Sequence, residues 1–215
     1  MQLSRDEFLT RYNQGNLKIA FIGMSNIGKS YLSTRLAKAY GFERTEIDQH
    51  IQAKLAYKSM TALATWQGHP YEEGYQQREA TYLALEGAAT EAALSNVSGL
   101  SMLDTAGSVI YLDEKILNRL KTIFYIVYIK ASQADLKRLE EMYFQHPKPL
   151  IWNNHFTSNP QKSSEDNIRT SYPELIAARQ RHYEALADTT LPSNMIYDGH
   201  IQDADMWQAL HPPQA

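Results

Sequence analysis

Residues Gly23-Met24-Ser25-Asn26-Ile27-Gly28-Lys29-Ser30 decide the fold of this chain. An apolar run from Leu17 to Ile22 comes before them, and Leu32, Leu36 and Tyr40 recur after them at four-residue spacing. This order predicts a strand, a glycine-rich turn and a helix. A G-x-x-x-x-G-K-S motif in that context is typical of a phosphate-binding loop, or P-loop.

Each position of the motif has a chemical reason. Gly23 and Gly28 let backbone N–H groups turn inward at the helix N-terminus, where the macrodipole also attracts anions. The Lys29 ammonium can reach the β- and γ-phosphates, and the Ser30 hydroxyl can bind Mg²⁺. The alternative is a glycine-rich turn that binds no ligand. With ATP and Mg²⁺ as the expected cofactors, the expected nucleotide-binding residues are Gly23, Ser25, Asn26, Ile27, Gly28, Lys29, Ser30 and Tyr31.

The composition bounds the class of protein. A chain of 215 residues with 43% hydrophobic residues suits one α/β domain, and its net charge of -3 does not favour nucleic acid as a partner. The absence of cysteine excludes disulfides, thiolate zinc sites and cysteine nucleophiles. No apolar run approaches about 18 residues, and the first residues do not resemble a signal peptide. We therefore expect a cytoplasmic protein without a membrane span, as a monomer or weak dimer.

Strands alternate with helices along the chain, which predicts a three-layer α/β sandwich with a mostly parallel, five-stranded sheet. The expected strands are 17–22, 42–47, 100–104, 122–129 and 195–197. The expected helices include one opened by a capping box at Ser4 and Glu7, then 48–66, 71–94, a helix capped by Ser132 and Asp135, and a helix from Pro173 to about 188. We divide the chain into an N-terminal helical extension, 1–16, and a single P-loop domain, 17–215.

Two acidic residues follow predicted strands. Asp48 comes after the second strand, where the carboxyl end of an open parallel sheet faces the ligand crevice. Asp104 ends an apolar strand, as a Walker B aspartate does, and can hold Mg²⁺ from opposite Ser30. The alternatives are a solvated residue for Asp48 and a turn cap for Asp104.

A polar segment and a lone arginine complete the candidates. From about 145 to 166 the chain is rich in His, Pro, Asn and Ser, with Lys148 and Lys162 as its basic residues. Such a segment inside a compact domain is either a lid or a mobile surface loop. Arg179 shares a helical stripe with Leu175 and Tyr183, which favours either a bound anion or a buried ion pair.

Taken together, these residues resemble the shikimate kinases, within the nucleoside-monophosphate-kinase-like group of P-loop folds. The resemblance covers about 17–210 and rests on an ordered set of short matches. These are Gly23 to Ser30, Glu46-Ile47-Asp48, Glu72-Glu73-Gly74-Tyr75 leading to Glu79, Gly107-Ser108-Val109, Lys148-Pro149-Leu150, and Arg179 ahead of Tyr183. It implies a helical substrate-binding insertion and a lid at about 145–166.

The resemblance also implies roles. Asp48 would orient the acceptor hydroxyl and take its proton, Lys148 would stand where a lid arginine approaches the transferred phosphoryl group, and Arg179 would grip a substrate carboxylate. The implied catalytic set is Lys29, Asp48 and Lys148. The implied substrate-binding set is Asp48, Arg78, Gly107 and Arg179, and the metal ligands are Ser30, Asp48 and Asp104.

The chain departs from the family on the acceptor side. Gln76 stands where the family has a second carboxylate-binding arginine, and the nearest cation is Arg78. Thr105-Ala106-Gly107 replaces a run of three glycines. We therefore expect an ATP-dependent kinase acting on a hydroxyl of a small molecule. The alternative is a non-catalytic or regulatory ATP- or GTP-binding protein, since Asp104 to Gly107 also reads D-x-x-G, although no Asn-Lys-x-Asp motif is present.

Overall fold

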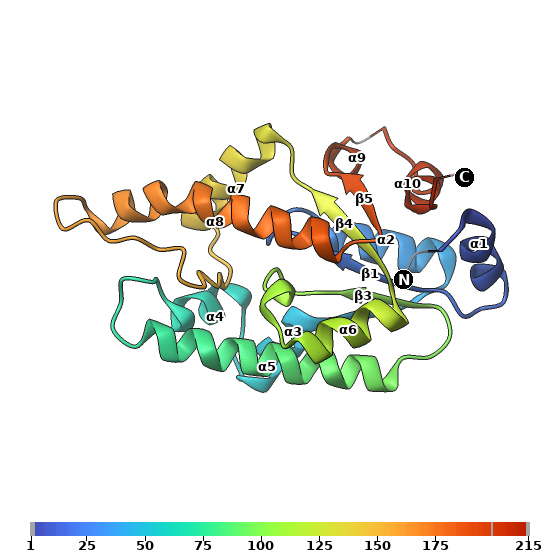
Figure 1. Cartoon of the computed structure of the whole chain (residues 1–215), viewed down its shortest axis with the longest axis horizontal. Coiled ribbons are helices and arrows are strands. Elements are labelled where there is room, and N and C mark those ends of the chain that lie inside the picture. The colour runs from blue at the N-terminus through green and yellow to red at the C-terminus, as the bar shows by residue number, and fades with distance from the viewer. Residues whose placement is uncertain (1–2, 199, 214–215) are drawn as a thin grey trace.

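Five strands form one sheet at the centre of the computed structural model, which describes residues 3–198 and 200–213 (Figure 1). The strands are β1 Lys18–Ile22, β2 Glu43–Glu46, β3 Ser101–Asp104, β4 Tyr125–Lys130 and β5 Thr189–Pro192. Their order is β2-β3-β1-β4-β5, and all four pairings are parallel. The predicted α/β fold is confirmed, and the sheet is entirely parallel.

The helices lie around this sheet in two layers. They are α1 Arg5–Asn13, α2 Lys29–Tyr40, α3 Ile47–Lys54, α4 Met60–Gln67, α5 Tyr75–Asn96, α6 Glu114–Ile123, α7 Gln133–Gln145, α8 Ser164–Leu186, α9 Asn194–Tyr197 and α10 Asp203–Leu210, with a 3-10 turn at Val109–Tyr111. Helix α2 packs on β1, β2 and β3, while α8 packs on β4 and α5 packs on α3 and α6. Helices α4, α7 and the first half of α8 extend toward the same end of the molecule, at the left of Figure 1.

Burial on both faces explains the central strands. In β1 the residues from Ile19 to Ile22 are fully buried, and β4 is buried from Tyr125 to Ile129. Continuous apolar runs are what a parallel strand covered by two helical layers requires. The register places Phe21 beside Asp104, and Asp104 beside Glu46. The carboxyl ends of β1, β2 and β3 therefore meet at one edge of the sheet, next to the P-loop.

The prediction of the fifth strand was wrong. Residues 195–197 belong to the short helix α9, and β5 is Thr189–Pro192, paired with β4 from Val127 to Lys130. Three apolar residues do not distinguish a strand from a helix. Thr189 and Thr190 carry the β-branched side chains that favour strands, and Pro192 is tolerated because β5 is an edge strand.

The prediction that Pro173 begins a helix was also wrong. Helix α8 begins at Ser164, where the Ser163 hydroxyl accepts a hydrogen bond from the Asp166 backbone, and Pro173 lies inside it. Proline in a helix interior costs about 3 kcal/mol. The turns on either side bury Tyr172, Leu175 and Ile176, and this tertiary packing offsets the loss.

Other boundaries also differ from the prediction. The predicted helix 48–66 is two helices, α3 and α4, with Ala56 at φ 57° between them. Asp48 therefore lies in the first turn of α3 and not at the end of a strand. Helix α5 begins at Tyr75 after Gly74, which adopts φ 75°. The capping boxes at Ser4 and Ser132 are confirmed.

Helix α1 packs against α10 through aromatic side chains. Phe8 is fully buried, and its ring lies 5.3 Å from that of Tyr125 and 5.4 Å from that of Trp207. Tyr12 lies 4.9 Å from Trp207. Aromatic burial of this kind makes the largest contributions to a core.

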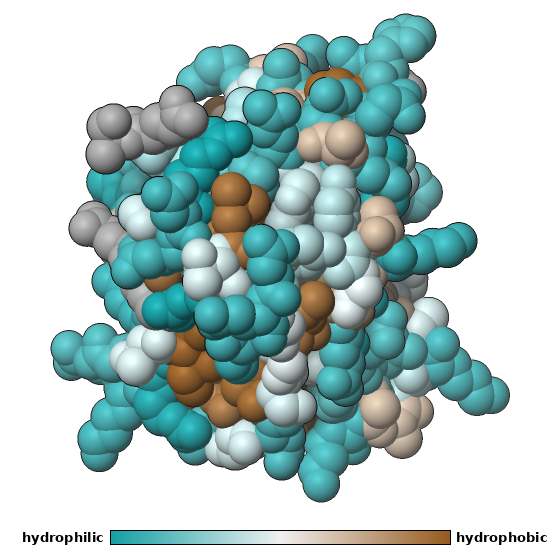
Figure 2. Space-filling model, turned by 90° about the vertical axis from the view of Figure 1, so that its right-hand side faces the viewer, coloured by the Kyte–Doolittle hydropathy of each residue, from teal (hydrophilic) through white to brown (hydrophobic). Residues whose placement is uncertain are grey.

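The outer surface at this end is mostly hydrophilic. Figure 2 views the side that carries α1 and α10, and apolar side chains reach its surface in a few small areas. Within the described residues, no helix combines the length and apolarity needed to cross a membrane.

Replacing Phe8 tests whether α1 belongs to the core. We expect Phe8→Ala to lower the free energy of unfolding by about 3–5 kcal/mol, because it leaves a cavity between α1, β4 and α10. Thr10→Ala on the exposed side of the same helix should change it by less than about 0.5 kcal/mol. Urea denaturation followed by circular dichroism measures both. Equal stability of the two variants would contradict the packing described.

Candidate functional site

The P-loop has the backbone geometry that its glycines predict. Gly23 adopts φ 143°, and a Cβ there would lie 2.9 Å from the Ile129 carbonyl oxygen. Gly28 adopts φ 103°, and a Cβ there would lie 2.8 Å from a methyl group of Ile196. Gly28 is also the N-cap of α2 and provides no side-chain cap. The first N–H groups of α2 are therefore available to an anion.

Lys29 is folded back over the loop that precedes it. Only 6% of the residue is exposed, and its Nζ donates to the carbonyls of Gly23 at 2.9 Å and Met24 at 3.0 Å. Burial lowers the pKa of Lys29, and the negative charges of Asp104 and Asp48 oppose that shift. A buried ammonium bonded only to neutral oxygens is a strong attractor for phosphate.

Several predicted residues line one cavity of about 250 Å³. Its walls contain Ser25, Asn26, Gly28, Lys29, Ser30, Asp48, Arg138, Met142, Lys148 and Tyr197. The structure thus brings the three predicted catalytic residues to the same place. Gly23, Ile27 and Tyr31 are not among the lining residues. Ile27 is buried, and the exposed Tyr31 hydroxyl accepts a hydrogen bond from Arg35.

Asp48 reaches this cavity from the first turn of α3. Its Oδ1 accepts a hydrogen bond from the Tyr82 hydroxyl at 3.1 Å. Burial raises the pKa of Asp48, although the charges of Lys29 and Lys148 act in the opposite direction. A carboxylate with a raised pKa is a better proton acceptor near neutral pH than an exposed one.

Asp104 is engaged in an ion pair. Arg44 donates to Asp104 Oδ2 at 2.6 Å and to Glu46 Oε2 at 2.6 Å, and Ser33 donates to the same Asp104 oxygen at 3.3 Å. Ser30 instead donates to Glu46 Oε1 at 3.4 Å. Arg44, on β2, thus bridges the carboxylates of Asp104 and Glu46. The sequence analysis did not predict this contact. Over the described ranges, no cluster of three His, Asp or Glu side chains is arranged as a metal site.

The first half of the segment predicted as a lid, 145–166, is held in place by burial and hydrogen bonds. Leu150, Ile151 and Trp152 are at most 8% exposed. The Glu79 carboxylate accepts hydrogen bonds from the backbone of Trp152 at 2.6 Å and of Asn153 at 3.1 Å. The Tyr75 hydroxyl donates to the Leu150 carbonyl at 2.8 Å. This places Lys148 over the P-loop cavity, while most residues from 153 to 163 are exposed.

Arg179 is buried without a carboxylate partner among the described residues. Its guanidinium donates to the carbonyls of Gly107 at 3.3 Å and Ile151 at 2.6 Å, and its Nε has no hydrogen-bond partner there. Of the two alternatives from the sequence, the buried ion pair is therefore not formed. Gly107 lies against the P-loop, since a Cβ there would be 2.8 Å from Ser25 Oγ. Arg179 and Gly107 thus occupy one side of the site.

Arg78 lies in a different environment from the other predicted binding residues. Its guanidinium donates to the carbonyls of Gln67 at 2.8 Å and Glu73 at 2.9 Å, and to the Glu72 carboxylate at 3.2 Å. These bonds hold the turn between α4 and α5. The structure does not bring Arg78 into the P-loop cavity, so its predicted contact with substrate has no support in the geometry.

Sequence reasoning did not assign Tyr197 or Glu86 to the site, and it noted Arg138 only as the neighbour of Leu139, where the resemblance expects an arginine near the adenine. Arg138 from α7 lies over the ring of Tyr197 at 4.5 Å, and both side chains bond the Asn26 carbonyl. Tyr197 could not be found because its segment was read as a strand. Glu86 lies in the middle of α5, and its only signal was a charged residue on the otherwise buried face of a helix.

Glu86 is fully buried. One of its oxygens, Oε2, accepts a short hydrogen bond from the Ser108 hydroxyl, and Oε1 has no partner among the described residues. Burial raises the pKa of Glu86 to about 8, partly opposed by the Ser108 bond and by the charges of Arg179 and Lys29. The charge of Asp48 raises it further. Glu86 therefore belongs to the same electrostatic environment as Asp48 and Arg179.

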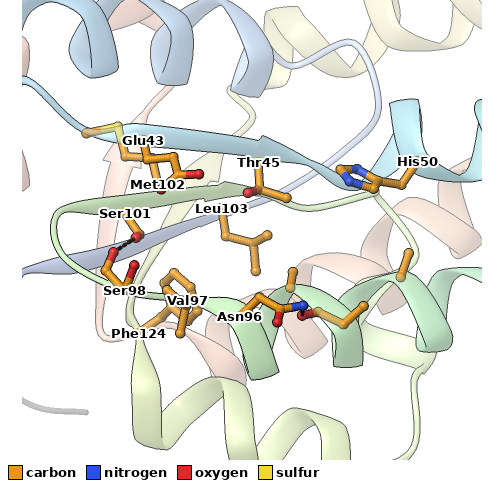
Figure 3. A pocket seen from close by; sticks show the side chains of 13 residues that line it. Glu43, Thr45, His50, Asn96, Val97, Ser98, Ser101, Met102, Leu103 and Phe124 are labelled. Atoms are coloured by element: carbon orange, nitrogen blue, oxygen red, sulfur yellow. Dashed lines mark hydrogen bonds between the residues drawn. The ribbon is translucent and has the colours of Figure 1, made fainter.

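A separate cavity of about 180 Å³ lies along β2 and β3, beside the last turns of α5 (Figure 3). Glu43 and Ser101, at the first residues of β2 and β3, line it together with Asn96 and Val97 from the end of α5. This cavity shares no lining residue with the P-loop cavity.

The fold is similar to that of solved shikimate kinases. A shikimate kinase from Acinetobacter baumannii in complex with shikimate aligns over 91% of this chain and 90% of that one, with 17% identity and a TM-score of 0.62. Shikimate kinases from Bacteroides thetaiotaomicron and Aquifex aeolicus align with 13% and 16% identity and TM-scores of 0.62 and 0.53. They cover 89% and 90% of this chain, and 95% and 91% of their own. No family model and no curated protein matches the sequence. The chain has a shikimate-kinase-like P-loop fold.

The burial of Glu86 generates a prediction about pH. The pKa of Glu86 in the folded state is about 8, above the ordinary value of 4.5, because burial favours the protonated carboxyl. The contribution of this shift to the free energy of unfolding is therefore fully present below pH 4.5 and is lost as pH rises to about 8. At about 1.4 kcal/mol per unit, the stability of the wild type relative to Glu86→Gln should fall by up to roughly 5 kcal/mol over this range. Urea denaturation at pH 5 and pH 8.5 measures it. Parallel pH curves for the two proteins would contradict the raised pKa.

Proposed function

We propose that this protein transfers the γ-phosphate of ATP to a hydroxyl of a small molecule. The observation that supports this most strongly is the single cavity lined by Lys29, Ser30, Asp48 and Lys148. Phosphoryl transfer needs positioning and charge neutralisation more than covalent chemistry, and this cavity combines two cations with one proton acceptor.

Each residue of the cavity has a role in this proposal. The N–H groups at the start of α2 and the Lys29 ammonium bind the phosphate chain, and Lys148 approaches the transferred group from the lid. Asp48 accepts the proton of the acceptor hydroxyl while that oxygen bonds to the γ-phosphorus and the bond to the β-phosphate oxygen breaks. Tyr82 orients Asp48 through its 3.1 Å hydrogen bond. The packed first half of the 145–166 segment covers the site, and closure of its exposed second half, 153–163, would exclude water.

Magnesium fits the oxygen donors that are present. Mg²⁺ is usually held by one or two protein ligands together with substrate phosphates, and it neutralises the charge on the β- and γ-phosphates. We assign Ser30, Asp48 and Asp104 to it. Arg44 and Ser33 both bond Asp104 at Oδ2, so Asp104 would contribute through Oδ1.

The partner in this proposal is a small-molecule acceptor and not nucleic acid. We place the protein in the cytoplasm as a monomer or weak dimer. A nucleotide-binding switch is the second candidate, because Gly107 of the D-x-x-G sequence lies directly against Ser25 of the P-loop. Competition between ATP and GTP for binding separates the two functions: a strong preference for GTP favours the switch.

The roles of Lys29 and Asp48 differ in a measurable way. We expect Lys29→Ala to lower kcat/KM by at least about 10³-fold, because it removes phosphate binding and charge neutralisation together. Asp48→Asn should lower kcat by about 10²–10⁴-fold while the affinity for ATP changes less than about 3-fold. ADP release measured with an acceptor panel, together with nucleotide titration, tests both.

Lys38→Ala is the matched control for Lys29→Ala, since Lys38 is exposed in the last turn of the same helix. It should retain wild-type activity. An Asp48→Asn enzyme with undiminished kcat would remove Asp48 from the mechanism. ATP binding without transfer to any hydroxy acid, sugar or nucleoside would instead support a non-catalytic nucleotide-binding protein.

A further inference from the structure

The acceptor side of the site contains a buried carboxyl group that the proposed chemistry does not use. Glu86 is 0% exposed, and it forms no ion pair within the described part of the chain. Its Oε2 is bonded to Ser108, while Oε1 is left without a partner. A buried polar atom without a partner is unfavourable in the free protein and becomes satisfied when a ligand supplies a hydrogen bond.

A continuous set of contacts places Glu86 between the two ends of the acceptor side. Tyr82, one turn earlier on the same face of α5, donates to Asp48 at 3.1 Å. On the other side, Ser108 follows Gly107, whose carbonyl accepts hydrogen bonds from Arg179 at 3.3 Å and from Tyr183. These contacts link the Glu86 carboxyl to the proposed proton acceptor on one side and to the buried arginine on the other.

The charges on this side favour a carboxylate ligand less once Glu86 is ionised. Two carboxyl groups, Asp48 and Glu86, act here against the charges of Arg179 and Lys29. Arg179 already donates to the carbonyls of Gly107 and Ile151. Gln76, the residue in the position of a second arginine, is exposed and uncharged. A bound carboxylate would be repelled whenever Glu86 is ionised. A hydroxyl suits either state, because it donates to a carboxylate and accepts from a carboxylic acid.

We propose that Glu86 determines acceptor specificity, and that the acceptor is a neutral polyhydroxylated compound of the sugar or cyclitol class. One hydroxyl bonds Glu86 Oε1 while a neighbouring hydroxyl meets Asp48. This inference rests on the proposed kinase function for the location of the acceptor, but it concerns which compound binds and not whether phosphate is transferred.

Matched pairs of compounds test the proposal. Hexoses are compared with their hexuronic acids, and shikimate with its hydroxymethyl analogue, by calorimetric titration of the protein loaded with Mg²⁺ and a non-hydrolysable ATP analogue. For at least one pair, the wild type should bind the neutral member at least roughly 10-fold more tightly than the acid at pH 9, where Glu86 is mostly ionised. Equal or tighter binding of the acids throughout, or no binding of any neutral compound, overturns the proposal.

Two substitutions assign the effect to Glu86. Glu86→Leu should weaken binding of the neutral compound by roughly 10–100-fold, because the hydrogen bond is lost, whereas Glu86→Gln keeps a donor and an acceptor and should stay within about 3-fold. Glu91→Leu, on the surface of the same helix, is the control and should match the wild type. If Glu86→Leu folds and binds like the wild type, the proposal is wrong.

A pH profile gives a readout that does not need Glu86→Leu to fold. The charged and titratable groups that act on Glu86 are Asp48 from α3, Lys29 from α2, Arg179 from α8 and Tyr82 on its own helix. In the wild type, the affinity for the acid should fall several-fold more than that for its neutral partner between pH 7 and pH 9. In Glu86→Gln this difference should disappear. An unchanged difference in Glu86→Gln overturns the proposal.

The transfer assay with ATP separates this inference from the kinase function. If neutral compounds bind through Glu86 but receive no phosphate, the inference holds and the proposed kinase function fails. If phosphate is transferred to an acid as efficiently as to its neutral partner, the kinase function holds and the inference fails.

Discussion

Lys29 is buried, with 6% of the residue exposed to solvent. Among the described residues, its ammonium group donates hydrogen bonds to the carbonyls of Gly23 and Met24. Burying an ammonium without a hydrogen-bonded counter-charge is costly, so pairing Lys29 with a phosphate is favourable. Gly23 and Gly28 make the P-loop possible, because a side chain at either position would collide with β4 or α9. The sheet and α2 therefore position one buried cation at the carboxyl edge of the strands.

The two halves of the site differ in the charged groups that they contain. On the phosphate side, Lys29 and Lys148 line a cavity together with the N-terminus of α2, as a polyanion requires. On the acceptor side, the single buried arginine is bonded to backbone carbonyls, and Glu86 stands beside it with an oxygen free. The fold is like that of the shikimate kinases, and these contacts are the basis for proposing a ligand with less negative charge.

The strongest local patterns in the sequence predicted the fold correctly. The P-loop with its flanking strand and helix, the buried runs of β1 and β4, and the capping boxes all depend on neighbours within a few residues. Where tertiary packing outweighs propensity, the prediction failed: α8 runs through Pro173, and residues 195–197 are helical. Arg44, Arg138 and Glu86 act through partners far along the chain, so spacing alone does not reveal them.

Calorimetric titration of the wild-type protein with Mg²⁺·ATP and with adenosine tests the central claim that the buried Lys29 and the P-loop bind a phosphate chain. The account predicts saturable one-to-one binding of Mg²⁺·ATP, at least about 100-fold tighter than adenosine, because the phosphates satisfy the buried ammonium and the N–H groups of α2. Equal affinity for the two compounds, or no binding of Mg²⁺·ATP, would contradict it.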